Sequence, residues 1–278
     1  MQYVSTRGHA ATPSFSDILL GGLAPDGGLY LPATYPQVSG AELDQWRTLS
    51  YADLAFEVLK KFATDIPEAD LKALAHKTYT ADVYRNTRAG EDASQITPLR
   101  TLQEEDGKKL VLQSLSNGPT LAFKDMAMQL LGNLFEYALA KKGAELNIVG
   151  ATSGDTGAAV AHAFYGLPNV KVVILYPRGK ISPLQEKLFC TLGGNIETVA
   201  IDGDFDACQA LVKQAFLDND LNQKYNLASA NSINIARLIP QSFYYFRAYA
   251  QVKHLGLPVV FSVPSGNFGN LSAGILAY

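Results

Sequence analysis

Short apolar runs alternate with longer helical patterns over the last two thirds of the chain, and this alternation constrains the fold more than any other feature. The expected strands are 110–115, 146–151, 170–176, 195–201 and 259–263. The expected helices are 121–141, 156–165, 183–192, 205–217 and 233–253. Nearly continuous apolar strands separated by helices are typical of a parallel sheet that helices cover on both faces. The sequence therefore predicts a doubly wound α/β fold.

The first 93 residues have a different rhythm and predict a mainly helical region. Apolar residues recur with helical spacing over 50–62, and further helices are expected at 14–20 and 67–77. A turn at 25–28 precedes a short extended segment. We therefore expect an N-terminal, mainly helical domain at 1–93 and an α/β region at 94–278.

The composition excludes several classes of protein. The chain has 278 residues, 47% of them hydrophobic, and can bury a sizeable core. A net charge of −3, without runs of like charge, argues against a nucleic-acid partner. No apolar run reaches the roughly 18 residues that span a bilayer, so no membrane partner is expected. Residues 1–12 lack the apolar core of a signal peptide.

The cysteines and histidines point to neither disulfides nor a metal site. Cys190 and Cys208 are far apart in the sequence, which predicts a reducing compartment. The four histidines show no spacing typical of metal ligands, so no metal is expected. We therefore expect a cytoplasmic protein.

The last ten residues, 269–278, have the pattern of a helix that begins and does not finish. They contain neither a glycine C-cap nor a basic last turn. We therefore expect the chain to be incomplete at its C-terminal end.

Lys124 is the first candidate functional residue, because it is one ammonium group within the otherwise apolar segment 121–128. Lysine side chains are normally solvated, and an isolated buried charge is costly. Burial lowers the pKa of a lysine and makes its amine a usable nucleophile or base. Covalent catalysis through a carbonyl group needs such an amine. A lysine with a buried stem and a solvated head would give the same pattern.

A glycine-rich loop with hydroxyl side chains, 150–157, follows the expected strand 146–151 and precedes a helix. Its small residues allow a ligand to approach the backbone, and the N–H groups at a helix start attract anions. Thr152, Ser153 and Thr156 add hydroxyl groups. An ordinary loop in which Asp155 caps the helix is the alternative interpretation.

A second glycine-rich loop, 264–270, also lies between an expected strand and a helix. Its two glycines with polar neighbours suit a phosphate group held by backbone amides. The loop matches neither a P-loop nor a dinucleotide fingerprint. Doubly wound folds bind ligands in loops at the carboxyl ends of their strands, so both loops are candidate ligand sites.

Together these motifs resemble the threonine synthases, a family of fold-type II enzymes that depend on pyridoxal phosphate. The resemblance covers essentially the whole chain, and it rests on residues 5–8, 22–30, 118–125, 150–157 and 264–270. It implies the doubly wound, mostly parallel sheets of the tryptophan synthase β-like class, with a mainly helical N-terminal region.

The resemblance implies a role for each motif. Lys124 would be the catalytic residue and would hold pyridoxal phosphate covalently through its amine. The other residues expected at the cofactor are Asp155, Ser265, Gly266, Asn267, Phe268, Gly269 and Asn270. The residues expected at the substrate are Thr152, Ser153, Gly154, Thr156, Ser182, Asn231, Ser232, Asn234 and Arg237. For Arg237, a position on the helix surface is the alternative.

Asp155 departs from the pattern of the wider fold, in which an asparagine usually neighbours the phenolic oxygen of the cofactor. A carboxylate repels a phenolate, so we expect Asp155 to be protonated, bridged by water or turned to a backbone amide.

The activity that the resemblance implies is the conversion of O-phospho-L-homoserine and water to L-threonine and phosphate. Two alternatives stay open at this stage. The first is another fold-type II lyase, of the dehydratase or cysteine synthase type. The second is an inactive homologue that binds pyridoxal phosphate or phosphate. The sequence does not predict the oligomeric state.

Overall fold

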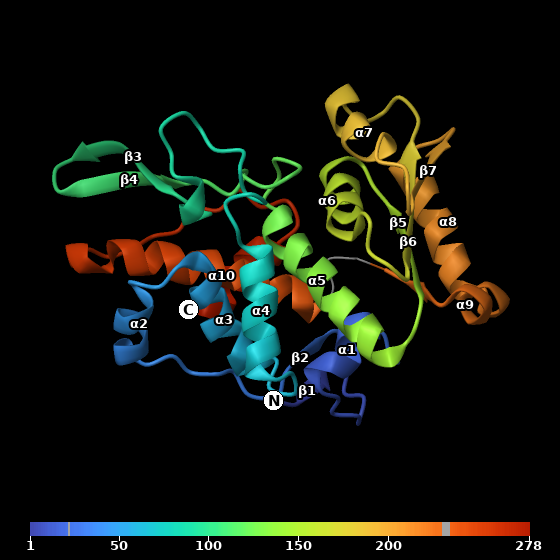
Figure 1. The fold of residues 1–278 in the computed structure, drawn as a ribbon, viewed down its shortest axis with the longest axis horizontal. Helices are drawn as coiled ribbons and strands as arrows, with labels where there is room; N and C mark the ends of the chain where they lie inside the picture. The colour runs from blue at the N-terminus through green and yellow to red at the C-terminus, as the bar shows by residue number, and fades with distance from the viewer. Residues whose placement is uncertain (22, 230–233) are drawn as a thin grey trace.

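The computed structural model describes residues 1–21, 23–229 and 234–278, and it contains a parallel sheet with helices on both faces (Figure 1). Four strands pair in the order β7-β6-β5-β8. Their bounds are β5 Leu146–Ala151, β6 Val170–Pro177, β7 Ile196–Ile201 and β8 Leu227–Ala228. Every pairing is parallel, with Leu146 opposite Val170 and Val172 opposite Ile196. The predicted doubly wound α/β fold is confirmed.

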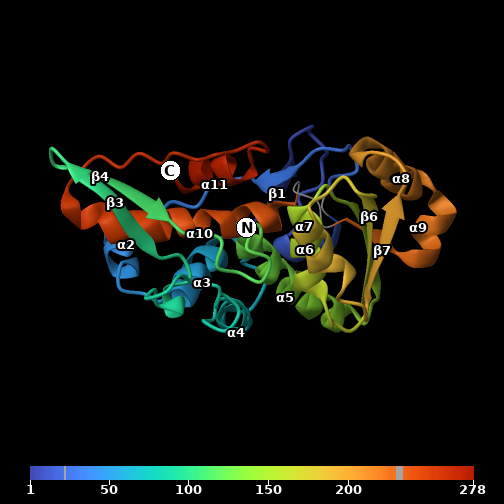
Figure 2. The ribbon, with the colours of Figure 1, turned by 90° about the horizontal axis from the view of Figure 1, so that it is seen from above.

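Helices on the two faces of this sheet come from consecutive parts of the chain. The helices α6 (Asp155–Phe164) and α7 (Pro183–Cys190) lie on one side, and α8 (Phe205–Leu217) and α9 (Asn219–Tyr225) lie on the other (Figures 1 and 2). The chain moves outward from β5 to β7 and then returns to the far side of β5 at β8. Loops diverge where the winding direction reverses in this way, and a ligand crevice forms there.

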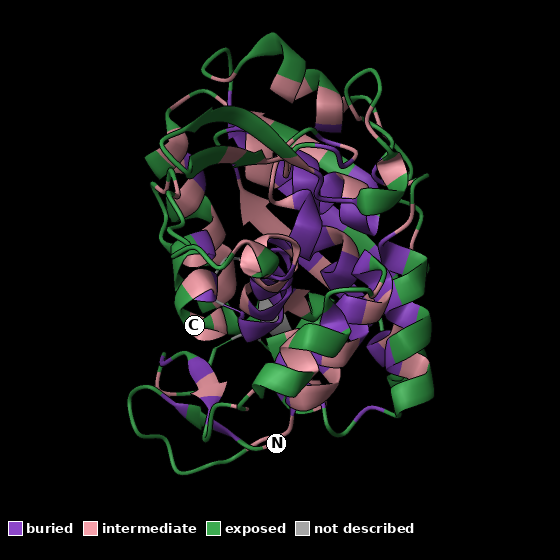
Figure 3. Cartoon of the chain, turned by 90° about the vertical axis from the view of Figure 1, so that its left-hand side faces the viewer, coloured by how far each residue is buried: buried purple, intermediate pink, exposed green. Residues whose placement is uncertain are grey.

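The remaining helices form a second layer that shares one hydrophobic core with the sheet region. The N-terminal elements are β1 Tyr3–Ser5, α1 Phe15–Gly21, β2 Tyr30–Pro32, α2 Gly40–Trp46, α3 Tyr51–Phe62 and α4 Glu68–Thr78. They pack on the long helices α5 (Asp125–Lys142) and α10 (Ile235–Val252). The buried segments gather in the interior of the molecule (Figure 3). Because α5 contacts both α10 and α6, it connects the two layers. Within the described ranges, no helix is both long and apolar enough to cross a membrane.

The expected strand 110–115 is wrong in its bounds and in its place in the fold. The structure has a separate antiparallel hairpin of β3 (Leu99–Glu105) and β4 (Lys108–Gln113), which projects from the molecule (Figure 1). Asp106 and Gly107 both have positive φ, of 50° and 71°. Asp-Gly in this conformation is a tight hairpin turn that reverses the chain at once, so no helical crossover is needed.

The expected strand 259–263 does not form. The segment has no strand partner among the described residues, and its apolar side chains are largely exposed, with Val260 at 88%. An apolar run becomes a strand only where a neighbouring strand accepts its backbone hydrogen bonds. The chain re-enters regular structure at α11 (Gly269–Ala277).

The contact between α5 and α6 depends on Gly132. A Cβ atom added there would lie 2.2 Å from the carbonyl oxygen of Ala163 in α6. We expect Gly132→Ala to lower the free energy of unfolding by about 1–3 kcal/mol, because the helices would have to separate. Urea unfolding measures this change. Gly40→Ala is the matched control, since an added Cβ there meets nothing within 4 Å, and a loss of equal size in it would contradict the explanation.

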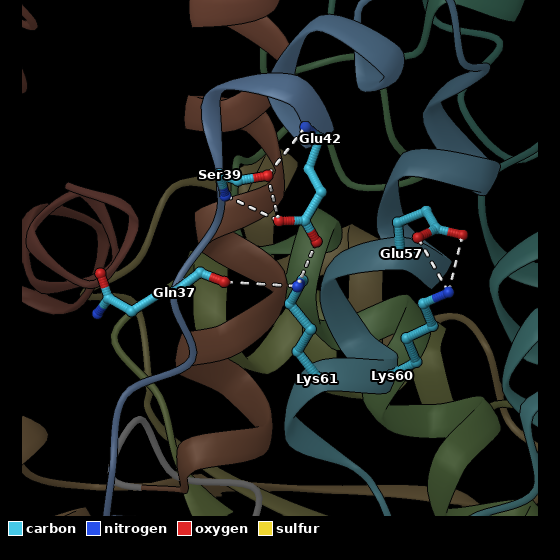
Figure 4. A network of polar contacts seen from close by, with 6 residues as sticks. All are labelled: Gln37, Ser39, Glu42, Glu57, Lys60 and Lys61. Atoms are coloured by element: carbon cyan, nitrogen blue, oxygen red, sulfur yellow. Dashed lines mark hydrogen bonds and ion pairs between the residues drawn. The ribbon is translucent and has the colours of Figure 1, made fainter.

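A polar network joins α2 to α3 in the N-terminal layer (Figure 4). Ser39 and Glu42 form a reciprocal capping box at the start of α2. Lys61 of α3 donates to Glu42 Oε1 at 2.6 Å and to the carbonyl oxygen of Gln37 at 3.5 Å. The hydrogen bond from Lys61, followed by those from Ser39, lowers the pKa of Glu42 from 4.5 to about 2.

This lowered pKa predicts an acid-dependent part of the stability. The Glu42 carboxylate stabilises the fold above pH 4.5, and its contribution is lost as the pH falls toward 2. Glu42→Gln should therefore be less stable than the wild type at neutral pH, and the difference should narrow in acid. Urea midpoints at a series of pH values measure it. In a Lys61→Met background, Glu42→Gln should cost less stability at neutral pH, because the lysine no longer stabilises the carboxylate. A stability difference between wild type and Glu42→Gln that stays constant with pH would contradict the role assigned to Glu42.

Candidate active site

A cavity of about 720 Å³ lies at the reversal between β5 and β8, within the size range of small-molecule sites. Its walls come from β2, the start of α5, β5 with the loop that follows it, β6, the first turns of α6 and α10, and the loop that leads into α11. The face of α8 completes it. The predicted residues that line the cavity are Lys124, Thr152, Ser153, Thr156, Asn234, Arg237, Gly266, Asn267, Phe268, Gly269 and Asn270.

A fixed turn places Lys124 at the cavity. Lys124 immediately precedes α5, four residues after Thr120, whose backbone N–H and hydroxyl both donate to the Asp125 carboxylate at 2.8 Å. Leu121 has a positive φ of 60°, a conformation uncommon for a leucine, so this turn is held by its surroundings. Burial raises the pKa of Asp125. The sequence predicted that this helix begins at Leu121, but it begins at Asp125.

The amine of Lys124 is partly shielded and has a carboxylate partner. Its side chain is 21% exposed, and Nζ lies 3.5 Å from Oδ2 of Asp155 and 5.2 Å from the centre of the Phe123 ring. The lysine therefore turns toward the loop after β5 instead of extending into solvent.

Asp155 is the first residue of α6, and its carboxylate does not cap that helix. Its Oδ1 accepts a hydrogen bond of 2.6 Å from the side-chain amide of Gln185, and its Oδ2 faces Lys124. One expectation was that Asp155 turns to a backbone amide; its carboxylate instead accepts from a side-chain amide. Gln185 has no role in the predictions from sequence, because it lies on α7, 30 residues along the chain.

Thr152 shapes the loop after β5. Its buried hydroxyl accepts hydrogen bonds from the backbone N–H groups of Gly154 and Gly157, at 3.0 and 2.8 Å. Gly157 has no room for a side chain, since a Cβ there would lie 2.5 Å from Thr152. Ser153 and Thr156 remain at the cavity wall, while Gly154 is buried behind it.

The loop before α11 is braced by Asn270 and Ser265. The hydroxyl of Ser265 donates to Asn270 Oδ1 at 2.6 Å, and Tyr245 donates to the carbonyl oxygen of Asn270 at 2.8 Å. Ser265 itself is not part of the cavity wall, whereas residues 266–270 are. Because α11 begins at Gly269, the start of this helix opens on the cavity, where backbone N–H groups attract an anion.

The first turns of α10 add a buried cation to the site. Asn234 caps the helix by accepting from the backbone N–H of Ala236 at 2.9 Å. Arg237 is only 5% exposed, so the alternative of a surface arginine is excluded. Burial lowers the pKa of Arg237 to about 10, which leaves the guanidinium charged at neutral pH. Asn231 and Ser232 lie outside the described residues.

Ser182 is placed away from the cavity wall. It caps α7, where its hydroxyl accepts from the backbone N–H of Gln185 at 3.2 Å. The sequence predictions also missed two walls. Tyr30 lies in a motif that the resemblance included without assigning it a role, and Gln209 and Lys213 of α8 line the cavity on one helical face. Among the described residues, no group of three or more metal-binding side chains gathers.

Comparison with known proteins defines the class first. The model of the pyridoxal-phosphate dependent enzyme family matches residues 88–278, which include every described wall of the cavity except β2. The chain is thus a member of this class of enzymes.

A second family model, described as the threonine synthase N terminus, matches residues 2–79. Threonine synthase of Methylobacillus glycogenes is 52% identical over 100% of this chain and 58% of its own length. The Escherichia coli threonine synthase is 47% identical, over 100% of this chain and 60% of its own. The chain belongs to the threonine synthase family, and it spans somewhat more than half the length of these relatives.

Solved structures agree. The structure of PLP-bound threonine synthase from Brucella melitensis matches with a TM-score of 0.88 at 43% identity, covering 100% of this chain and 57% of that one. The yeast threonine synthase matches with a TM-score of 0.89 at 41% identity, covering 99% and 55%. The fold-type II assignment is confirmed.

Proposed function

We propose that this chain carries the active site of a threonine synthase, which converts O-phospho-L-homoserine and water to L-threonine and phosphate. One observation supports the proposal above all others. Lys124, the loop after β5 and the loop before α11 are far apart in the sequence, yet all line one cavity. A reactive amine, a small-residue loop and an anion-binding helix start are the parts that such a reaction needs.

The residues present fit pyridoxal phosphate. The cofactor carries an aldehyde, which requires an amine, and a phosphate, which requires several hydrogen-bond donors. Lys124 would supply the amine, and backbone N–H groups of 266–270 would hold the phosphate at the start of α11. Bound there, the cofactor would supply an electron-withdrawing ring that stabilises negative charge at the adjacent substrate carbon.

The roles of the chain's own residues follow from their positions. Nζ of Lys124 would take the proton from Cα of the substrate and return protons later, because it is the amine next to the cofactor. The start of α6, with Ser153 and Thr156, would hold the substrate carboxylate. In the overall reaction the Cγ–O bond to phosphate and one Cβ–H bond break. The hydroxyl of water adds at Cβ, a proton adds at Cγ, and the remaining proton leaves with the phosphate.

Arg237 favours a substrate with a phosphate group over the substrates of a dehydratase or a cysteine synthase. Its guanidinium is buried in the cavity wall and charged at neutral pH, and a planar fork of donors matches phosphate. Asn234, one turn earlier, would add an amide group.

The proposal is tested by adding pyridoxal phosphate and then O-phospho-L-homoserine to the purified chain. A visible absorption band of the protein-bound cofactor, followed by equal amounts of phosphate and L-threonine, is the expected result. A band without any phosphate release would instead identify an inactive homologue. Release of phosphate with a product other than threonine would identify a different lyase.

The proposal extends to the organisation and location of the protein. It assigns residues 1–93 to an N-terminal helical domain and 94–278 to the cofactor-binding region. It places the protein in the cytoplasm, as part of threonine biosynthesis, with a small-molecule substrate. Both cysteines are free thiols, which is in keeping with a reducing compartment.

A further inference from the structure

A continuous chain of hydrogen bonds connects α7 to the amine of Lys124. The hydroxyl of Ser182 lies 3.2 Å from both the backbone nitrogen and Oε1 of Gln185. The Gln185 amide donates to Oδ1 of Asp155 at 2.6 Å, and Oδ2 of the same carboxylate lies 3.5 Å from Nζ of Lys124. Each of the carboxylate's two oxygens therefore has its own partner.

The backbone leaves a space for this arrangement at Gly154. A Cβ atom added there would lie 2.7 Å from Oε1 of Gln185 and 2.8 Å from its Nε2. A side chain at position 154 would therefore displace the amide from Asp155. The φ of Gly154 is 149°, which side chains other than hydrogen rarely adopt, so the loop is built around a glycine at this point.

We propose that Gln185 is a positioning residue, which fixes the Asp155 carboxylate so that Oδ2 faces the nitrogen of Lys124. The Asp155 side chain is 44% exposed, so water can replace the amide hydrogen bond without fixing the direction of the carboxylate. A positive charge on the Lys124 nitrogen is stabilised only while Oδ2 faces it. This inference rests on the proposed function, since it assumes that Lys124 holds the cofactor.

Two cations, Arg237 and Lys213, line the same cavity as Lys124. Three other titratable groups have partners of their own. Asp125 accepts from Thr120, His162 donates to the carbonyl oxygen of Leu188, and Glu186 accepts from Tyr176. Among the described residues, Asp155 is thus the one carboxylate that forms an ion pair with the Lys124 amine.

The test is the pH at which the visible band of the cofactor-loaded chain changes. Gln185→Met keeps the length of the side chain and removes the amide, so the midpoint should fall by about 0.5–1 pH unit, a threefold to tenfold change in proton affinity. Gln185→Glu adds a negative charge beside Asp155, so the midpoint should rise. If Gln185 only packed α7 against α6, the two substitutions would shift the midpoint in the same direction or leave it unchanged.

Two further variants complete the experiment. Ser182→Ala loosens Gln185 while keeping its amide, so it should shift the midpoint in the same direction as Gln185→Met and by less. Gln251→Met is the matched control, because that glutamine donates to the carbonyl oxygen of Arg247 on α10 and lies outside the cavity. Unchanged midpoints in both Gln185 variants, with the band present, would overturn this inference alone. A wild-type chain that shows no band would overturn the proposed function, and the inference with it.

Discussion

Lys124→Ala should abolish the visible absorption band of the loaded chain and lower the rate of threonine formation on the order of 10³-fold or more. The variant removes the amine that faces the cavity, and with it both covalent attachment and a proton carrier, for which proton transfer alone accounts for roughly 10²–10⁴-fold. The fold should survive, because the turn before α5 is held by Asp125 and Thr120 and not by the lysine. Visible spectra and a threonine assay on the same sample measure both effects.

Lys141→Ala is the control for this variant. Lys141 lies in the last turn of the same helix, with a side chain that is 57% exposed and paired with Asp70. It should keep the band and the activity. If Lys124→Ala kept the band while Lys141→Ala lost it, the assignment of the amine would be wrong.

Arg237→Met should raise the KM for O-phospho-L-homoserine by about 50-fold and change kcat much less. Hydrogen bonds to a charged group contribute about 1.5–3 kcal/mol, which corresponds to roughly 10–150-fold in affinity. The guanidinium would contact the phosphate before and during the reaction, so its loss should act on binding. Steady-state kinetics measure the two constants, and inorganic phosphate should inhibit the variant more weakly than the wild type.

Arg247→Met is the matched control for the substrate contact. Arg247 lies on the same helix and is partly buried, but its guanidinium donates to the carbonyl oxygen of Leu49 at 2.9 Å and does not line the cavity. Its loss should leave KM unchanged. An unchanged KM in Arg237→Met would show that the substrate phosphate binds elsewhere, with Lys213 of α8 as the next candidate in the cavity wall.

The sheet and the two glycine-rich loops could be predicted from the sequence because their signals are local. An apolar run followed by small residues and a helix is complete within about 20 residues, as in 146–164. The strand expected at 110–115 belongs instead to the hairpin β3–β4, because the Asp106-Gly107 turn, whose conformation is typical of hairpins, reverses the chain. The strand predicted at 259–263 was wrong, because the apolar pattern of this segment does not reveal whether a neighbouring strand is available to pair with it.

The contacts that complete the site could not be predicted, because they depend on how elements pack. Gln185 reaches Asp155 only because α7 lies against α6, and Ser182 supports Gln185 instead of facing the cavity. Lys213 and Gln209 line the cavity because α8 crosses β5 and β6. No short segment of sequence contains these relationships.

The central claim is that the amine of Lys124 holds pyridoxal phosphate in this cavity. The most direct test is to load the chain with pyridoxal phosphate, reduce it with borohydride so that the cofactor stays on its amine, and map the digested peptides by mass spectrometry. The account predicts one modified peptide, with the added mass on Lys124. Modification at another lysine, or of many surface lysines equally with Lys124 unmodified, would contradict it.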